Sequence, residues 1–126
     1  IAIGSMDFII TPTADAFDVE IPQLNAVYTH MLGHDCHSLV ANAGHADGII
    51  AQLWDYIEKG YDLILTSHYT PEDLKDAKTK IDYLTNLKQI AAACADADSF
   101  KAEVKKQCPA YSGENYLDMT ANFFFA

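Results

Sequence analysis

The histidines are the residues of this chain whose spacing is most suited to chemistry. Four of the five histidines fall between residues 30 and 45, and the fifth, His68, directly follows an apolar run and two hydroxyl residues. Neutral imidazole is the commonest protein ligand of zinc, and carboxylates complete such sites. His34, Asp35 and His37 offer two nitrogens and one oxygen within four residues, on a loop that begins with a glycine. This cluster predicts a site for a divalent metal ion.

Ordinary structural roles remain open for several of these residues. His30 continues a predicted strand and is expected to be structural, whereas His45 opens a predicted helix and is expected to be a capping or surface residue. Cys36 is either a soft metal ligand or a buried free thiol. The chain has three cysteines, too few and too widely spaced for a disulfide scaffold, so at least one thiol is free in a monomer.

The elements that must position the cluster are of mixed type up to residue 67. Apolar and acidic residues alternate over residues 17–21, which is the period of a half-buried strand. With strands at 7–11 and 26–29, this predicts an antiparallel meander. Apolar residues spaced by three and four predict a helix over 45–59, ended by Gly60. The near-continuous apolar run of 62–67 predicts a strand covered on both faces.

From residue 70 onward the pattern is almost purely helical. Thr70 as N-cap and Pro71 at the first helical position predict a helix start, and its apolar stripe runs to Cys94. A shorter helix is expected from Asp96 to before Pro109, and Ser112 is expected to cap a last one.

The last helix ends in three adjacent phenylalanines, residues 123–125. Three adjacent rings cannot all face one side of a helix. Either this helix docks on the core and leaves one ring at the surface, or the rings form a patch for another chain.

The order of these elements resembles the C-terminal half of the metallo-β-lactamase fold, an αββα sandwich. Asp35 ends the stretch LGHD (32–35) and matches the family's metal-bridging Asp, and His68 in LTSHY (65–69) matches its last His ligand. The resemblance covers about residues 17–87. It implies a zinc (or other divalent metal) hydrolase, dinuclear in the complete protein, with Asp35 and His68 as ligands and His34 and His37 as further candidates. Both leading ligands follow strands that point toward the same crevice, so we expect them to lie close together at one sheet edge.

We therefore expect an α/β fold, namely a partial αββα metallo-β-lactamase-like sandwich half with a helical C-terminal extension. Residues 1–126 are expected to form a single domain of a longer chain, with sheet, helix and metal loop in 1–69 and the extension in 70–126. The family's first metal motif, His-x-His-x-Asp-His, does not occur in these residues, and the chain does not begin with Met. Both observations favour a fragment whose N-terminal half carries that motif.

An alternative function is a non-catalytic metal-binding or protein-interaction module. A serine hydrolase is set aside, because neither Ser38 nor Ser67, the serines near histidines, lies in a Gly-x-Ser-x-Gly elbow.

The charge balance limits the partners. Eighteen acidic residues against eight basic ones, all of them lysine, give a net charge of −10. Such a chain repels phosphate backbones and anionic membranes and has no arginine to read either, so we expect neither nucleic acid nor membrane as a partner. No apolar run is long enough to span a bilayer. We expect a soluble protein of the cytoplasm or periplasm with a small-molecule substrate of unknown identity, and self-association is an alternative to the missing half.

Overall fold

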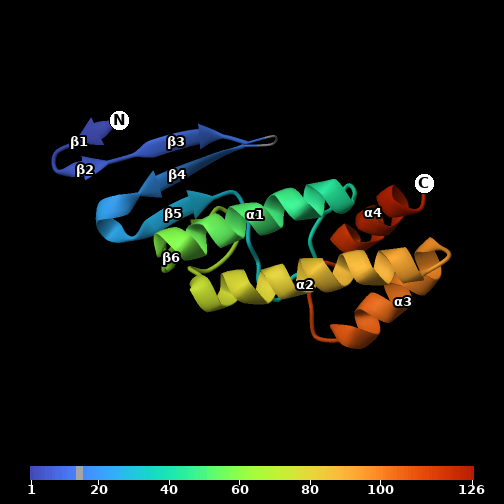
Figure 1. Ribbon diagram of the computed structural model, residues 1–126. Helices are drawn as coiled ribbons and strands as arrows, with labels where there is room; N and C mark the ends of the chain where they lie inside the picture. Colours follow the sequence, from blue (N-terminus) through green and yellow to red (C-terminus); the bar gives the residue numbers. More distant parts are fainter. Residues whose placement is uncertain (14–15) are drawn as a thin grey trace. The chain divides into compact units, whose positions relative to one another are not determined.

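A computed structural model of the chain describes residues 1–13 and 16–126 (Figure 1). The described part is mixed α/β, with four α-helices and two sheets. Its contacts divide it into two compact units. The first unit comprises Ile1–His34 and Leu53–Thr79, and the second comprises Asp35–Gln52 and Lys80–Ala126. No helix within the described ranges is long and apolar enough to cross a membrane.

The first unit is built on a four-stranded sheet of order β3-β4-β5-β6. These strands are β3 (Ile9–Pro12), β4 (Phe17–Ile21), β5 (Ala26–Thr29) and β6 (Leu63–Thr66). The first three pair antiparallel, which confirms the meander, and β4 and β5 have the predicted bounds. β6 pairs parallel to β5, with Thr66 opposite Thr29. A two-stranded hairpin, β1 (Ala2–Ile3) and β2 (Met6–Asp7), precedes this sheet, and a 3-10 turn, η1 (Pro22–Leu24), joins β4 to β5.

One face of this sheet packs on the end of helix α1 (Ala43–Lys59). Tyr56 donates a hydrogen bond to Asp18 over 2.5 Å, and Lys59 donates one to Glu20 over 2.8 Å. Side chains alternate along a strand, so Phe17, Val19 and Ile21 of β4 point to the other face. The strand register extends that second face across the sheet. We call it the open sheet face; its side chains are those of Ile10, Pro12, Phe17, Val19, Ile21, Ala26, Tyr28, Leu63 and Leu65.

The open sheet face is apolar, and several of its side chains are exposed to solvent. The exposed fractions of Ile10, Phe17 and Leu63 are 50%, 49% and 40%. The expectation that residues 62–67 form a strand covered on both faces is therefore wrong, because β6 buries Ile64 on the helix side and exposes Leu63 on the other. The apolar run therefore predicted burial correctly for only one of the two faces of β6.

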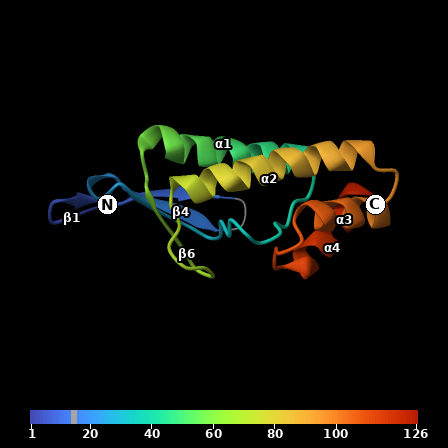
Figure 2. The same cartoon turned by 90° about the horizontal axis from the view of Figure 1, so that it is seen from below.

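The second unit is helical and has its own core. It contains the first part of α1, the greater part of α2 (Leu74–Ala93), and the neighbouring helices α3 (Ala97–Gln107) and α4 (Glu114–Phe124), shown in Figure 2. Its buried apolar residues include Val40, Leu84, Leu87, Phe100, Val104 and Leu117. The ring of Phe100 lies 6.0 Å from that of Phe124 and 5.6 Å from that of Phe125, whereas Phe123 is exposed. The last helix thus docks on the core and leaves one ring at the surface, the first of the two alternatives.

Of the three helix starts expected after residue 70, two differ from the sequence pattern. α2 begins at Leu74, not after Thr70, because the backbone of Glu72 pairs with that of Ile64 through hydrogen bonds of 2.8 and 2.9 Å. α4 begins after Gly113, which has a φ of 80° and no side-chain cap, so Ser112 is not its N-cap. The start of α3 is as expected, since Asp96 accepts a hydrogen bond from the backbone of Ser99 over 2.8 Å.

Candidate metal site

The parallel pairing of β5 and β6 brings two loops of the first unit to one edge of the sheet. Parallel neighbours end at the same edge, where ligands of α/β sheets commonly bind. The imidazoles of His30 and His68 lie 5.0 Å apart between ring centroids, and the His34 ring lies 5.7 Å from that of Tyr69. The backbone N–H of Ser67 also donates to the carbonyl of His30 over 3.2 Å. The strand-end residues of both loops are therefore neighbours.

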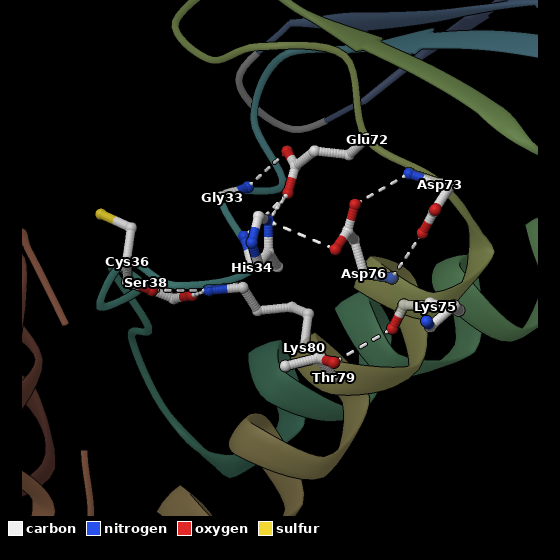
Figure 3. Close-up of polar contacts among 10 residues, drawn as sticks. All are labelled: Gly33, His34, Cys36, Ser38, Glu72, Asp73, Lys75, Asp76, Thr79 and Lys80. Carbon is white, nitrogen blue, oxygen red and sulfur yellow. Dashed lines mark hydrogen bonds and ion pairs between the residues drawn. The ribbon is translucent and has the colours of Figure 1, made fainter. Parts of the chain in front are cut away.

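Three side chains at this edge converge on one point: His34, Glu72 and Asp76 (Figure 3). His34 Nδ1 lies 2.7 Å from Glu72 Oε2 and 3.5 Å from Asp76 Oδ1. One ligand atom from each of the three residues lies within 4.8 Å of the other two. His34 comes from the loop after β5, Glu72 from the segment between β6 and α2, and Asp76 from the first turn of α2. All three belong to the first unit.

The Glu72 carboxylate is fixed by backbone groups. Its Oε1 accepts a hydrogen bond from the N–H of Gly33 over 3.0 Å, and its Oε2 accepts one from the N–H of His34 over 2.8 Å. A buried carboxylate needs such donors to offset the loss of water. Each carboxylate oxygen has two lone pairs, so Oε2 can hold the His34 amide and a metal ion together. These bonds hold the Glu72 carboxylate in place without an ion.

Asp76 is fixed by the cap of its own helix. Its Oδ2 accepts from the N–H of Asp73 over 3.0 Å, and its own N–H donates to Asp73 Oδ1 over the same distance. This reciprocal pair is a capping box with Asp in both positions. The N–H of Asp76 holds the pKa of Asp73 below its usual value, since the bond favours the charged carboxylate. The arrangement leaves Asp76 Oδ1 directed at His34.

The donor set fits a divalent metal. Metal–ligand distances of about 2.0–2.2 Å place tetrahedral ligand atoms about 3.4 Å apart. The 3.5 Å between His34 and Asp76 already matches this spacing, and the 2.7 Å between His34 and Glu72 needs a small opening. The side chains of His34 and Asp76 are 33% and 25% exposed, while that of Glu72 is 1% exposed, so solvent reaches one side of the group. Three protein ligands with an open fourth position are typical of catalytic zinc sites. The same contacts also form a satisfied hydrogen-bonded cluster without an ion.

The two leading ligands predicted from the resemblance lie outside this group. Within the described ranges, neither Asp35 nor His68 belongs to a set of three converging ligands. The carbonyl of Asp35 accepts a hydrogen bond from the N–H of Ser112 in the second unit, and His68 packs edge-on against His30 in the first. Their closeness to each other stays a prediction.

The remaining candidate residues have structural contacts. His37 is buried in the second unit, where its Nδ1 lies 3.0 Å from the hydroxyl of Tyr83. Burial lowers the pKa of His37. His45 Nδ1 accepts from the N–H of Ala41 over 3.0 Å, which confirms a capping role at the start of α1. Cys36 is a buried free thiol, as the simpler alternative had it.

Sequence reasoning missed Glu72 and Asp76. The sequence pattern places Glu72 in the first turn of a predicted helix, where negative charge is favourable in any case, and it assigns no role to Asp76. The available signal was their position just after the β6 strand, at the same sheet edge as the histidine loop. An acid in that position has to be considered as a possible ligand before it is assigned to a helix cap.

No family model, no curated protein and no solved structure matches this chain. The contacts among His34, Glu72 and Asp76 are therefore the basis for assigning a role to this site.

Proposed function

We propose that this chain binds a divalent metal ion, zinc in the first place, through His34, Glu72 and Asp76. The observation that carries the proposal is the convergence of one imidazole nitrogen and two carboxylate oxygens within 4.8 Å at the end of two parallel strands. An imidazole with two carboxylates suits zinc and similar first-row ions better than calcium, which prefers six to eight oxygens. A doubly charged ion would also neutralise the two carboxylates.

Calorimetric titration of the whole chain with zinc tests this proposal. We expect one ion per chain and a large loss of affinity in His34→Ala and Asp76→Asn, since even an outer partner of a ligand is worth about 10- to 100-fold. Asp98→Asn is the matched control, because Asp98 is an exposed acid near a helix start whose contact is an ion pair with Lys101. Equal affinities of the parent and the His34→Ala chain would exclude this site.

A second candidate function is a metal-dependent hydrolase similar to the metallo-β-lactamases. Two features support it: the strand-end His68 beside His30, and an apolar sheet face of the kind that a second sheet covers in a sandwich. In this function Asp35 and His68 would hold the metal, as the resemblance implies. A divalent metal there supplies Lewis acidity to a scissile bond.

Ligand substitutions separate the two functions. If the hydrolase proposal holds, Asp35→Asn and His68→Ala reduce the metal content of the complete protein and abolish its hydrolysis. If the chain is a non-catalytic metal-binding module, those two variants keep the parent's zinc affinity and only substitutions of His34, Glu72 and Asp76 lower it. Metal analysis by mass spectrometry gives the readout in both cases.

A further inference from the structure

Lys80 is a buried lysine in the second unit whose amine lies against a serine. The residue is 2% exposed. Its Nζ lies 2.7 Å from the carbonyl oxygen of Cys36 and 2.9 Å from Ser38 Oγ (Figure 3). It also lies 4.7 Å from the centre of the Tyr83 ring. A serine hydroxyl at hydrogen-bond distance from a buried amine is the arrangement that activates a nucleophile.

We propose that Ser38 and Lys80 form a serine–lysine pair that accepts acyl groups from small esters, independently of any metal. Burial disfavours the charged form of an amine, and a neutral lysine is a general base in catalytic sites. In the neutral form Nζ donates one hydrogen to the Cys36 carbonyl and accepts the hydrogen of Ser38. The Tyr83 ring and the Cys36 carbonyl oxygen also suit an ammonium group, in which case Lys80 only anchors the backbone.

The reaction follows from these two atoms. Ser38 Oγ attacks the ester carbonyl carbon as its proton passes to Lys80 Nζ, and an oxygen–carbon bond forms. The bond from that carbon to the alcohol oxygen then breaks, and Nζ returns the proton to the leaving alcohol. Water later attacks the acyl-serine by the same route, which releases the acid and restores the serine.

The backbone around Ser38 is held in place although no nucleophile elbow surrounds it. The Ser38 carbonyl accepts a hydrogen bond from Thr120 Oγ1 over 2.9 Å, and Thr120 Oγ1 in turn accepts one from the N–H of Val40 over 2.8 Å. Ser38 itself is half-buried and its neighbour Leu39 is exposed. Ser38 therefore keeps some contact with solvent, whereas Lys80 is shielded from water. The sequence alone suggested no base for Ser38, because Lys80 lies 42 residues away along the chain.

Labelling with a small fluorophosphonate tests the proposal. We expect mass spectrometry of the digested chain to find the label on Ser38, and we expect none in Ser38→Ala. Lys80→Met keeps an unbranched side chain of nearly the same length without the amine. It is expected to slow labelling about a hundredfold, the typical contribution of a general base. Ser112→Ala is the control, because Ser112 is an exposed serine of the same unit. Removal of metal with a chelator is expected to leave labelling unchanged, whatever the fate of the metal-site proposal.

Three results would overturn the proposal. They are no label on Ser38, equal labelling of Ser112 and Ser38, or unchanged labelling in a Lys80→Met chain with the parent's circular dichroism. If Lys80→Met does not fold, hydrolysis of p-nitrophenyl acetate by the parent and by Ser38→Ala decides, since Ser38 Oγ contacts only Lys80 among the hydrogen bonds described here. Equal rates of those two chains leave Lys80 as a backbone anchor and reject the pair.

Discussion

A buried carboxylate that accepts several hydrogen bonds stabilises a fold whether or not it also holds an ion. Glu72 accepts bonds from Gly33, from the backbone of His34 and from the His34 ring. In Glu72→Gln an amide N–H₂ replaces one oxygen and faces these donors, so one of them loses its acceptor. We expect the metal-free variant to unfold with a free energy about 1–3 kcal/mol below the parent's, measured by urea titration. Glu58→Gln, at an exposed position, is the control and is expected to match the parent. No loss in the Glu72 variant would mean that the carboxylate contributes nothing without a metal.

His37 makes the stability of the chain depend on pH in one direction. Burial among Tyr83 and Tyr111 lowers its pKa from 6.5 and outweighs the opposing charge of Glu114. Below pH 6.5 the unfolded chain binds a proton that the folded chain resists. This contribution is therefore complete above about pH 6.5 and is lost as the pH falls toward the lower pKa of the folded state.

Urea unfolding at pH 7.5 and 5.5 measures this effect. The parent is expected to lose more free energy of unfolding between these two values than His37→Gln, which has no imidazole at that position. An identical loss in both chains would assign the acid sensitivity to other groups.

At the scale of elements, some boundaries follow from local sequence patterns, and others follow from pairing between residues far apart in the chain. β4 and β5 lie where the sequence predicted them, because a two-residue alternation is a local property that pairing preserves. α2 begins at Leu74, three residues after the expected first helical residue Pro71, because Glu72 pairs with Ile64 of β6 and no local rule contains that contact.

The candidate site divides in the same way. The loops after β5 and β6 do meet at one sheet edge, through His30 and His68, whereas the predicted closeness of Asp35 and His68 stays a prediction. Glu72 and Asp76 could not be paired with His34 from the sequence, because only the folded edge brings them within ligand distance.

The junction before α4 offers a test of steric fit. Gly113 has a φ of 80°, and a Cβ built there would lie 2.7 Å from Cys36 Sγ. Gly113→Ala is therefore expected to lower the free energy of unfolding by about 1–2 kcal/mol for the left-handed backbone alone, and by more through the clash. Cys36→Ala removes the sulfur, so the double variant is expected to recover part of the loss, which a double-mutant cycle measures.

Gly48→Ala is the matched control for this cycle. Gly48 lies inside α1, and a Cβ there would have nothing within 4 Å. Alanine is favoured over glycine in a helix interior by about 1 kcal/mol, so this variant is expected to stabilise the chain. If the changes in the free energy of unfolding caused by Gly113→Ala and Cys36→Ala are additive, the alanine Cβ and the Cys36 sulfur do not clash.

At the scale of the whole molecule, the open sheet face differs from the rest of the chain in its lack of charged side chains. The chain carries a net charge of −10, yet none of the side chains on that face is charged. Exposed apolar surface on a sheet that is already covered on its other side is the condition for sheet-on-sheet packing, at a spacing of about 10 Å. In the hydrolase proposal, the sheet that covers this face would also supply the family's first metal motif.

We therefore expect the complete protein to contain a second β-sheet that packs on the open sheet face and carries a His-x-His-x-Asp-His motif. The reading frame upstream of the codon for Ile1 and the intact mass of the natural protein give the direct measurement. A structural check uses Ile10→Thr and Phe17→Thr, which make two exposed positions of that face polar. In the complete protein each is expected to destabilise the fold by about 1–3 kcal/mol, because a buried apolar side chain is replaced by one with an unpaired hydroxyl. In the 126-residue chain alone the same substitutions are expected to change stability by less than about 0.5 kcal/mol, as at ordinary surface positions. A natural protein with neither the motif nor a second sheet would reject the hydrolase and leave the metal-binding module as the function of this chain.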